Sequence, residues 1–389
     1  TTDLVTAPDI IFFWVARMIV AGYEFTGNQP FNNVYFTGIV RDKLGRKMSK
    51  SLGNSPDPLE LIDRFGADGV RMGLMLNAPA GHDIMYDDSL CEQGRNFCNK
   101  IWNAFRLIDG WTVNDSLAQP EHSRLAAKWF EAALQATMAE VDDLMGKFRI
   151  SEALMALYKL FWDEFSAWYL EIIKPGYQQP LDKQTMADVR RFFTVLLQLL
   201  HPFMPFITEE LWQHISPRQT GESIMVSQQP AINIQPGDAD LLKAFNTLKE
   251  IVAGVRTVRK QKQIPQKNPL ELLVLGQHDP MLDSILVKMA NLSAIKAVDE
   301  KPAMAAAWRV EATEYAIPLA GNVDVAEERA KLEVDLKRFK GFKAGVEKKL
   351  SNERFVANAP EAVVALERKK LADATAKIEA IEASLAALQ

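Results

Sequence analysis

The sequence predicts a mainly α protein with four parts in chain order: a short α/β segment, a helical bundle, a small mixed α/β region and an antiparallel coiled coil. Three observations predict this class. Apolar residues recur at intervals of three to five along much of residues 89–235. β-rich runs bounded by turn residues occur before and after that stretch. A heptad seam runs through residues 323–389.

Composition and charge exclude several classes of protein. With 389 residues, 48% of them hydrophobic and 24% charged, the chain has enough apolar surface for two or three globular domains. A formal net charge of -5 argues against uniform coating of nucleic acid, although it leaves room for local basic patches. No membrane association is expected, because no apolar run is long enough to span a bilayer and no secretory leader is visible.

The cysteines indicate the cellular location of the chain, and its first residues indicate whether it is part of a longer protein. Cys91 and Cys98, the two cysteines, have neither metal-ligand spacing nor the number needed for a disulfide framework. A reducing, cytoplasmic location is therefore expected. Thr1 is followed closely by the buried-looking run 10–15, so we also expect a fragment of a longer protein.

Residues 1–88 alternate short elements and are typical of the last part of an α/β domain. The apolar run that follows Asp9 predicts a helix with this aspartate near its N-cap. The β-rich run 33–40 predicts a strand. Asp57, which precedes a proline, and Asp68 are each expected to cap a short helix.

Residues 89–235 are expected to form a bundle of four or five helices. The first opens at Asp87, and the second follows an amphipathic stripe over 125–144. The third and fourth begin near Ser151 and Asp182.

Aromatic residues crowd the third of these helices, at Phe161, Trp162, Phe165, Trp168 and Tyr169. We interpret them as core rather than as a base-stacking surface, because they recur at helical spacing. His201 and His214 have no partner at the spacing of a metal site or a catalytic triad, so we interpret both as structural.

The region 236–322 combines a helix with strands. The helix is expected over 242–262, and strands are expected at 270–275 and around 308–310. The helix ends in a basic run, which consists of Arg256, Arg259, Lys260 and Lys262. This run either contacts nucleic-acid phosphates or simply complements the negative end of the helix dipole.

The seam in residues 323–389 predicts two helices that pack against each other. Ala374 and Ile378 belong to its second half, and a break over 351–360 separates the two halves, which predicts an antiparallel hairpin. Residues 337–354 carry seven cationic and two acidic side chains, a formal charge of +5 that suits binding along a folded RNA. The alternative to RNA binding is that the hairpin serves as a coiled-coil dimerisation element. We expect the chain to be a monomer.

The stretch GRKMSKSLGN, residues 45–54, places three cations and two hydroxyls between glycines. Lysine is a compact point charge on a long stem, which suits phosphate oxygens. Contacts that form mainly as an α-phosphate becomes five-coordinate lower the reaction barrier and not merely the binding free energy. Gly45 and Gly53 would let the backbone hinge and approach a nucleotide. An ordinary solvated basic loop is the alternative.

The pentamer KMSKS is the second signature of class I aminoacyl-tRNA synthetases, and the chain resembles the valyl-tRNA synthetases of that class over essentially its whole length. The resemblance is carried by DIIFFWVARM at 9–18, RNFCNKIWN at 95–103, HPFMPFITEELW at 201–212, KLSN at 349–352 and FVANAP at 355–360. It implies the C-terminal part of an enzyme, a ligase that joins valine to its tRNA through a valyl-adenylate, using ATP.

The resemblance also implies a division into domains. Residues 1–88 would be the last part of a Rossmann-like catalytic domain, with the KMSKS loop and a stem-contact region. Residues 89–235 would be the helical anticodon-binding domain, and 323–389 a coiled-coil tRNA-binding arm. The role of the small α/β region 236–322 stays open.

The resemblance assigns nucleotide and amino-acid contacts position by position. The catalytic cations Lys47 and Lys50 would hold the ATP phosphates, within an ATP-binding loop formed by Lys47, Met48, Ser49, Lys50 and Ser51. Asp9 would contact the aminoacyl-adenylate. Ile10 and Trp14, one helical turn apart, would wall the valine side chain. ATP would arrive with Mg²⁺ as substrate, and no protein-bound metal is expected.

Valine-accepting tRNA would be the macromolecular partner. The bundle would contact it through Arg95, Lys100 and Arg106, with ordinary solvated helix charge as the alternative for each. The arm would contribute Lys337, Arg338, Lys348, Lys349 and Arg354.

Two departures from the family pattern bear on activity. No His-x-Gly-His occurs in this sequence and the editing domain is missing, so no activation of valine by this chain alone is expected. Ala7 stands where relatives usually have glycine. Two other functions stay open: an isoleucyl-type synthetase fragment, and a non-catalytic RNA-binding or coiled-coil scaffold module.

Overall fold

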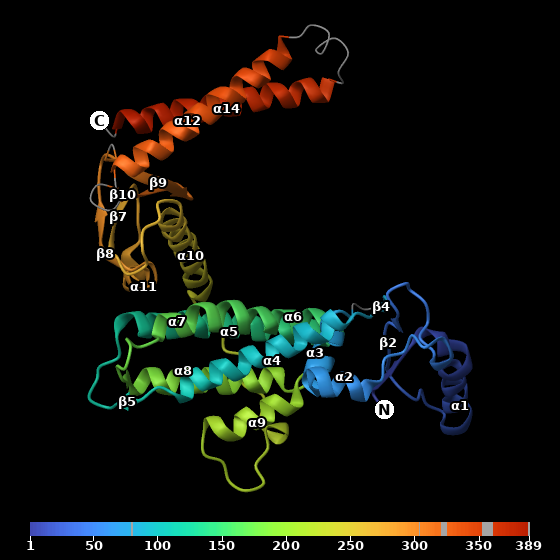
Figure 1. Cartoon of the computed structure of the whole chain (residues 1–389). Helices are drawn as coiled ribbons and strands as arrows, with labels where there is room; N and C mark the ends of the chain where they lie inside the picture. The colour runs from blue at the N-terminus through green and yellow to red at the C-terminus, as the bar shows by residue number, and fades with distance from the viewer. Residues whose placement is uncertain (79–80, 303, 320–324, 352–360, 388–389) are drawn as a thin grey trace. The chain divides into compact units, whose positions relative to one another are not determined.

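A computed structural model describes the chain except residues 79–80, 303, 320–324, 352–360 and 388–389. Its contacts divide the chain into two compact units, Thr1–Lys243 and Ala244–Gln389, each of which is described by itself (Figure 1). Helices dominate both units, as the sequence predicts. Among the described residues, no helix combines the length and the apolar character needed to cross a membrane.

The N-terminal segment contains two short parallel strand pairs. These are β1 (Asp3–Thr6) with β2 (Asn33–Phe36), and β3 (Val40–Arg41) with β4 (Ile84–Met85). The prediction of one strand over 33–40 is therefore wrong, because the chain changes its pairing partner between β2 and β3. At that point the N–H of Ile39 donates to the Asp83 carboxylate at 2.9 Å instead of continuing the ladder with β1.

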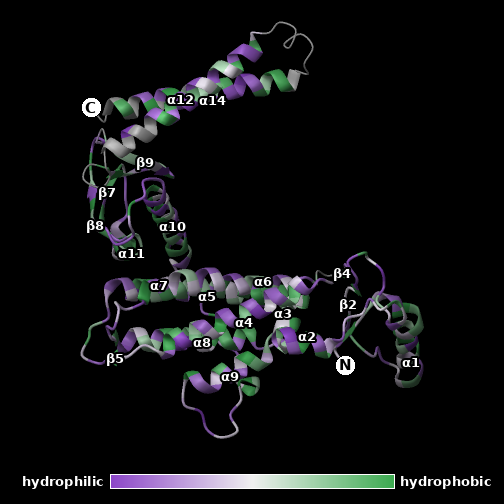
Figure 2. Ribbon diagram, viewed as in Figure 1, coloured by the Kyte–Doolittle hydropathy of each residue, from purple (hydrophilic) through white to green (hydrophobic). Residues whose placement is uncertain are grey.

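The helix predicted after Asp9 is present but broken. It consists of a 3₁₀ turn, a π-helical turn and an α-helix, which are η1 (Pro8–Ile10), η2 (Ile11–Val15) and α1 (Ala16–Thr26). Asp9 lies near the N-cap, as predicted: Ala7 is the N-cap, and Pro8, whose φ is already helical, stands between the two. Figure 2 shows α1 largely in the hydrophobic colour, yet none of its residues is buried.

Two short helices follow, α2 (Pro58–Phe65) and α3 (Ala67–Leu76), and their aspartates behave differently. Asp57 caps α2 as predicted, because its carboxylate accepts a backbone N–H two residues further on at 2.9 Å. The N-cap of α3 is Gly66, so the prediction that Asp68 caps its own helix is wrong.

Asp68 caps a different helix. Its carboxylate accepts the backbone N–H groups of Ile207 at 2.7 Å and Phe206 at 3.4 Å, at the start of α9 (Pro205–Ile215). Arg71, three residues along α3, donates to two carbonyls of the turn before α9 at 3.0 and 3.1 Å. An anion thus meets the positive end of α9, and a cation meets the carbonyls that precede it.

The bundle contains α4 (Asp88–Asp109), α5 (Glu121–Gly146), α6 (Ile150–Lys159), η4 (Leu160–Tyr169), α7 (Leu170–Ile173), α8 (Lys183–Leu200), α9 and the short turn η5 (Ile224–Val226). A strand pair, β5 (Val113–Asn114) with β6 (Leu181–Asp182), closes the end remote from α3 (Figure 1). The predicted helix starts at Asp87 and near Asp182 are confirmed, and each of these carboxylates caps its helix by accepting one of its backbone N–H groups.

The aromatic stretch of the bundle forms its core, as predicted. Phe161, Phe165 and Tyr169 are fully buried, while the two tryptophans of the stretch are half-buried. Each histidine contacts a neighbouring side chain of the bundle. His201 Nδ1 lies 2.7 Å from the Thr208 hydroxyl, and burial lowers the pKa of the imidazole. His214 Nε2 lies 3.1 Å from a glutamate carboxylate one turn earlier.

The second unit begins with a helix, a four-stranded sheet and a covering helix. They are α10 (Asp238–Gln261), most of which lies in this unit, β7 (Leu270–Leu275), the turn η6 (Pro280–Leu282), α11 (Asp283–Ala290), β8 (Leu292–Ala297), β9 (Ala305–Val310) and β10 (Thr313–Pro318). The strand order is β8-β7-β10-β9, with β7 and β8 parallel and the other pairs antiparallel. The two strands predicted from sequence are confirmed.

The basic run at the end of α10 is not uniform. Arg259 is 2% exposed, and its guanidinium donates to the carbonyls of Pro265, Asn268, Ala290 and Asn291 at 2.8 to 3.1 Å. A side chain held in this way joins α10 to β7 and α11 and is not available for phosphate. For Arg259, neither alternative for the basic run is therefore right.

Two long helices, α12 (Val325–Leu350) and α14 (Glu361–Ala387), pack against each other in the second unit. Ion pairs join Lys340 to Glu382 at 2.7 Å and Lys349 to Glu367 at 4.0 Å, so the helices run in opposite directions. The seam residues Ala374 and Ile378 are buried. From residue 352 onward, the predicted break lies outside the described residues.

Candidate functional site

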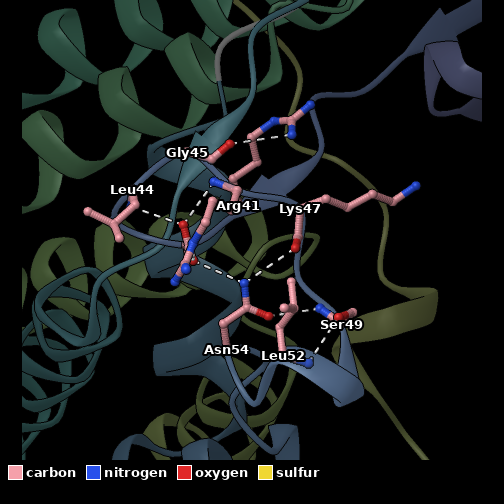
Figure 3. A network of polar contacts seen from close by, with 9 residues as sticks. Arg41, Leu44, Gly45, Lys47, Ser49, Leu52 and Asn54 are labelled. Atoms are coloured by element: carbon pink, nitrogen blue, oxygen red, sulfur yellow. Dashed lines mark hydrogen bonds and ion pairs between the residues drawn. The ribbon is translucent and has the colours of Figure 1, made fainter.

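The loop over 45–54 is closed at its base by a network of polar contacts (Figure 3). The Asp42 carboxylate accepts the backbone N–H groups of Leu44 at 3.0 Å and Arg46 at 2.9 Å, and the Arg46 Nε at 2.7 Å. It also accepts Nδ2 of Asn54 at 3.0 Å. The bond from Asn54, followed by those from Arg46 and Leu44, lowers the pKa of Asp42, so the carboxylate is ionised at neutral pH.

Asn54 ties the two sides of the loop together. Its Nδ2 donates to the carbonyl of Lys47 at 3.3 Å, and its Oδ1 accepts the N–H of Ser49 at 2.9 Å. Gly45 and Gly53 both have left-handed φ angles, 76° and 61°, a conformation that glycine adopts without strain. The loop is therefore fixed at its base, between two glycines, while its middle projects.

The lysines of the loop lie in that projecting part. Lys47 is exposed, and in Figure 3 its side chain extends away from the network. Its Nζ lies 3.5 Å from a carboxylate oxygen of Asp9, so the structure brings together two residues that the sequence predicted separately. Lys50 is also exposed and begins the short turn η3 (Lys50–Leu52).

The remaining residues of the loop have structural contacts. Ser49 is the N-cap of η3, with its Oγ accepting the N–H of Leu52 at 3.2 Å and lying 3.1 Å from Ser51 Oγ. The side chain of Met48 packs on the apolar cluster of Leu61, Phe65, Tyr86 and Cys91. Met48 therefore anchors the loop to the body of the first unit.

Ile10 and Trp14 do not share the face of one regular helix. Ile10 sits between η1 and η2 with φ -105° and ψ 13°, and Trp14 lies in the π-helical turn. Because a π turn holds more residues than an α turn, the spacing argument that aligned these two side chains is wrong. Trp14 is 57% exposed, and its neighbours Phe12 and Phe13 are exposed too.

A hollow of about 380 Å³ opens beside the loop. Its lining includes Asp42, Lys43, Met48 and Tyr86, but neither of the two predicted phosphate-binding lysines. Lys43 pairs with the Asp87 carboxylate at 2.5 Å. This hollow is therefore distinct from the surface on which Lys47 and Lys50 project.

The predicted tRNA contacts on α4 fall into two groups. Arg95 and Lys100 are half-buried, and each lies over an aromatic ring, Phe65 at 5.6 Å and Trp162 at 5.2 Å. Arg106 is exposed near the end of α4. The stems of the first two pack on the protein, which leaves Arg106 the most accessible of the three.

Some of the predicted tRNA-binding residues of the arm already form ion pairs with carboxylates of the arm. Lys349 is paired with buried Glu367, and Arg338 lies 3.0 Å from an Asp335 oxygen. Lys337 and Lys348 are exposed. Arg354 lies outside the described residues.

Sequence reasoning missed the Asp42–Asn54 pair that closes the loop. The two residues are 12 positions apart, a separation that matches no helical or strand period, so no local pattern indicates their contact. Among the described residues, no group of three or more histidine, cysteine, aspartate or glutamate side chains is arranged to hold a metal ion.

Three family models match different parts of the chain. They are described as tRNA synthetases class I (I, L, M and V) over residues 1–87, the anticodon-binding domain of tRNA ligase over 127–274, and the valyl tRNA synthetase tRNA binding arm over 324–389. The parts of the chain that carry the loop, the bundle and the helix pair are each similar to a part of such enzymes.

Curated relatives match over the whole chain. Valine–tRNA ligases from Parabacteroides distasonis and Phocaeicola vulgatus are 63% and 62% identical to it, over 100% of this chain and 44% of their own length. The chain thus spans less than half the length of these relatives. A solved structure of Mycobacterium tuberculosis methionyl-tRNA synthetase in complex with methionyl-adenylate shows a TM-score of 0.41 and 20% identity, over 54% of this chain and 43% of that one.

Proposed function

Because the chain belongs to the valine–tRNA ligase family, we propose that it carries the phosphate-clamping loop and the tRNA-binding parts of an enzyme that joins valine to its tRNA. The reaction would pass through a valyl-adenylate made from ATP. The observation that supports this most directly is the loop itself. Its base is closed by Asp42 and Asn54, while Lys47 and Lys50 project from it.

The proposed domains follow the division implied by the family. Residues 1–88 form the last part of a Rossmann-like domain, 89–235 an anticodon-binding bundle, 236–322 a small α/β region and 323–389 a coiled-coil arm. The two parallel strand pairs of the first part suit one portion of a larger parallel sheet. The enzyme would act as a cytoplasmic monomer.

Lys47 and Lys50 are the proposed catalytic cations. ATP, entering with Mg²⁺ as part of the substrate, places its phosphates against the loop. Lys47 then exchanges the Asp9 carboxylate, 3.5 Å away, for phosphate oxygens. Because the loop closes as charge grows on the α-phosphate, the two ammonium groups stabilise the transition state more than bound ATP. The loop base stays fixed, so only the segment between the two glycines has to move.

Asp9, Ile10 and Trp14 are the proposed amino-acid and adenylate contacts. Once Lys47 moves to phosphate, the Asp9 carboxylate can accept hydrogen bonds from the adenylate. Ile10 and Trp14 supply apolar surface for the valine side chain, although they do so from a π-helical turn rather than from one helix face. A pocket of this kind rejects larger side chains sterically but discriminates only weakly against an isostere such as threonine.

The tRNA would contact the bundle through Arg95, Lys100 and Arg106. It would contact the arm through Lys337, Arg338, Lys348, Lys349 and Arg354. Since exposed lysines and arginines act mainly by neutralising phosphates, affinity through the arm should fall steeply as salt rises.

Filter binding of the chain to valine and isoleucine tRNAs at two salt concentrations tests this proposal. We expect tighter binding of the valine tRNA at both concentrations, with a steep loss of affinity at the higher one. Equal binding of the two tRNAs would favour a scaffold that binds RNA without specificity, and a preference for isoleucine tRNA would favour the isoleucyl alternative. In pyrophosphate exchange the chain alone should be inactive, because its sequence lacks His-x-Gly-His.

A further inference from the structure

The turn between α7 and β6 presents an aromatic ring to solvent. Tyr177 is 90% exposed, and none of the large hydrophobic side chains that the structure describes is more exposed. The other tyrosine nearby along the chain, Tyr169, is fully buried. Single exposed apolar side chains are common on protein surfaces, so the exposure of Tyr177 gains meaning only from the turn that presents it and from the residue beside it.

This turn is held rigidly at both ends. Pro175 and Pro180 flank it, and the N–H of Gln179 donates to the carbonyl of Gly176 at 2.9 Å. Just beyond it, the N–H of Leu181 donates to a carbonyl beside β5 at 2.8 Å, and Leu181 itself is buried. A ring presented on so fixed a support loses little conformational entropy when it binds a partner.

The residue after the tyrosine is in a conformation that its side chain disfavours. Gln178 has a φ of 59°, in the left-handed region where glycine would be unstrained. Strained residues of this kind cluster where ligands are held. Gln178 is exposed and directly follows Tyr177 in the chain, and its side-chain amide has both a donor and an acceptor.

We propose that Tyr177 stacks on an unpaired base of the tRNA anticodon loop and that the Gln178 amide hydrogen-bonds the edge of that base. An aromatic face next to an amide matches the flat surface and polar edge of a nucleobase. The turn also lies within residues 127–274, which match a family model of an anticodon-binding domain. This inference rests on the proposed function, because it assumes that the chain binds tRNA.

The charge of the turn also favours a base over a phosphate or a protein partner. From 174 to 180, Lys174 is the only charged residue, and it lies 3.7 Å from the Glu171 carboxylate. Binding there would depend on stacking and hydrogen bonds, and it should change less with salt than binding through the arm.

Another exposed aromatic side chain of the bundle provides a matched control. Phe206 is 65% exposed at the start of α9, next to α3 and away from the β5–β6 end (Figure 1). Removing its ring tests whether any exposed ring on the bundle contributes to RNA binding.

The test uses the full chain, intact valine tRNA, and an anticodon hairpin with 2-aminopurine in its loop. Y177A should weaken binding roughly tenfold, the effect of losing one stacked base, while Y177F stays within about twofold of the parent chain. Quenching of 2-aminopurine on binding should disappear in Y177A and persist in F206A. Q178G should raise the thermal midpoint, because the left-handed strain is relieved, and should still weaken binding.

Two results would overturn the inference in distinguishable ways. If the parent chain binds valine tRNA but Y177A binds it equally well and still quenches 2-aminopurine, the stacking proposal fails while the proposed function stands. If the parent chain binds neither RNA, both fail. A Q178G variant that is stabilised yet binds like the parent would remove the role of the amide.

Discussion

Helices α8 and α1 are both rich in apolar residues, but they differ in how many of these residues are buried. α8 buries nine residues in the bundle, whereas α1 buries none and, with the turns before it, leaves Phe12, Phe25 and Trp14 exposed. Figure 2 shows both helices with strongly hydrophobic faces. Hydrophobic composition alone therefore does not distinguish a helix of the core from an apolar helix that is exposed. In the bundle apolar side chains stabilise the fold, and in the N-terminal segment they are exposed.

The largest expected effect is the loss of a core ring in the bundle. Phe165 is fully buried, with ring centroids 5.3 Å from Phe130 and 5.5 Å from Phe161. F165A should lower the free energy of unfolding by about 3–5 kcal/mol, since it removes apolar contacts and leaves a cavity. Urea unfolding followed by circular dichroism measures the change.

The matched control removes an exposed ring of the same type. Phe25, at the end of α1, is 84% exposed, so F25A should change the free energy of unfolding by less than about 0.5 kcal/mol. Similar losses in both variants would show that the N-terminal segment is as tightly packed as the bundle and would break the comparison.

The second effect concerns the contact between α3 and α9. D68A leaves two backbone N–H groups of α9 without their acceptor in a site where Asp68 is 5% exposed. We expect a loss of about 1–3 kcal/mol. D63A, which removes an exposed carboxylate on neighbouring α2, should be close to neutral. If both variants unfold at the same urea concentration, the Asp68 contact is not stabilising.

Asp68 also shows what sequence could and could not predict. The helix starts at Asp57, Asp87 and Asp182 were predicted correctly, because a carboxylate that caps a helix reaches only two or three residues along its own chain. Asp68 has the same local pattern, but its partners are 138 and 139 residues away. The helices of the bundle were predictable because the spacing of apolar residues along a helix is also a local signal.

The candidate site was predictable only in part. KMSKS identified the loop, but the groups that hold it, Asp42 and Asn54, were not predicted because their contact depends on how the chain turns back. Lys47 and Asp9 are 38 positions apart along the chain, so their ion pair depends on the fold and no local sequence pattern predicts it. The Ile10–Trp14 alignment failed because periodicity cannot distinguish a π turn from an α turn.

The third prediction concerns the loop, which polar contacts rather than apolar burial hold in place. N54A removes hydrogen bonds to Asp42, Lys47 and Ser49. Because the site is partly exposed, the cost should be about 1 kcal/mol or less, and it should be confined to the loop. Hydrogen exchange at the Ser49 amide should accelerate several-fold, while amides of α8 should exchange as in the parent. Acceleration throughout the first unit would contradict this local role.

The smallest expected effect lies in the arm, whose seam contains a charge. Glu367 is 6% exposed between α12 and α14, and its hydrogen bond from Lys370 at 2.7 Å lowers the pKa of the carboxyl. A lowered pKa means that the ionised form is favoured in the folded chain. The stabilising contribution is therefore present at neutral pH and is lost as pH falls through the folded-state pKa.

E367Q should be less stable than the parent at pH 7, and the difference should vanish in acid, when helix content is followed by circular dichroism. E379Q, which changes an exposed glutamate of α14, should show no such dependence. A pH-independent difference for E367Q would mean that shape, and not charge, sets the role of Glu367 in the seam.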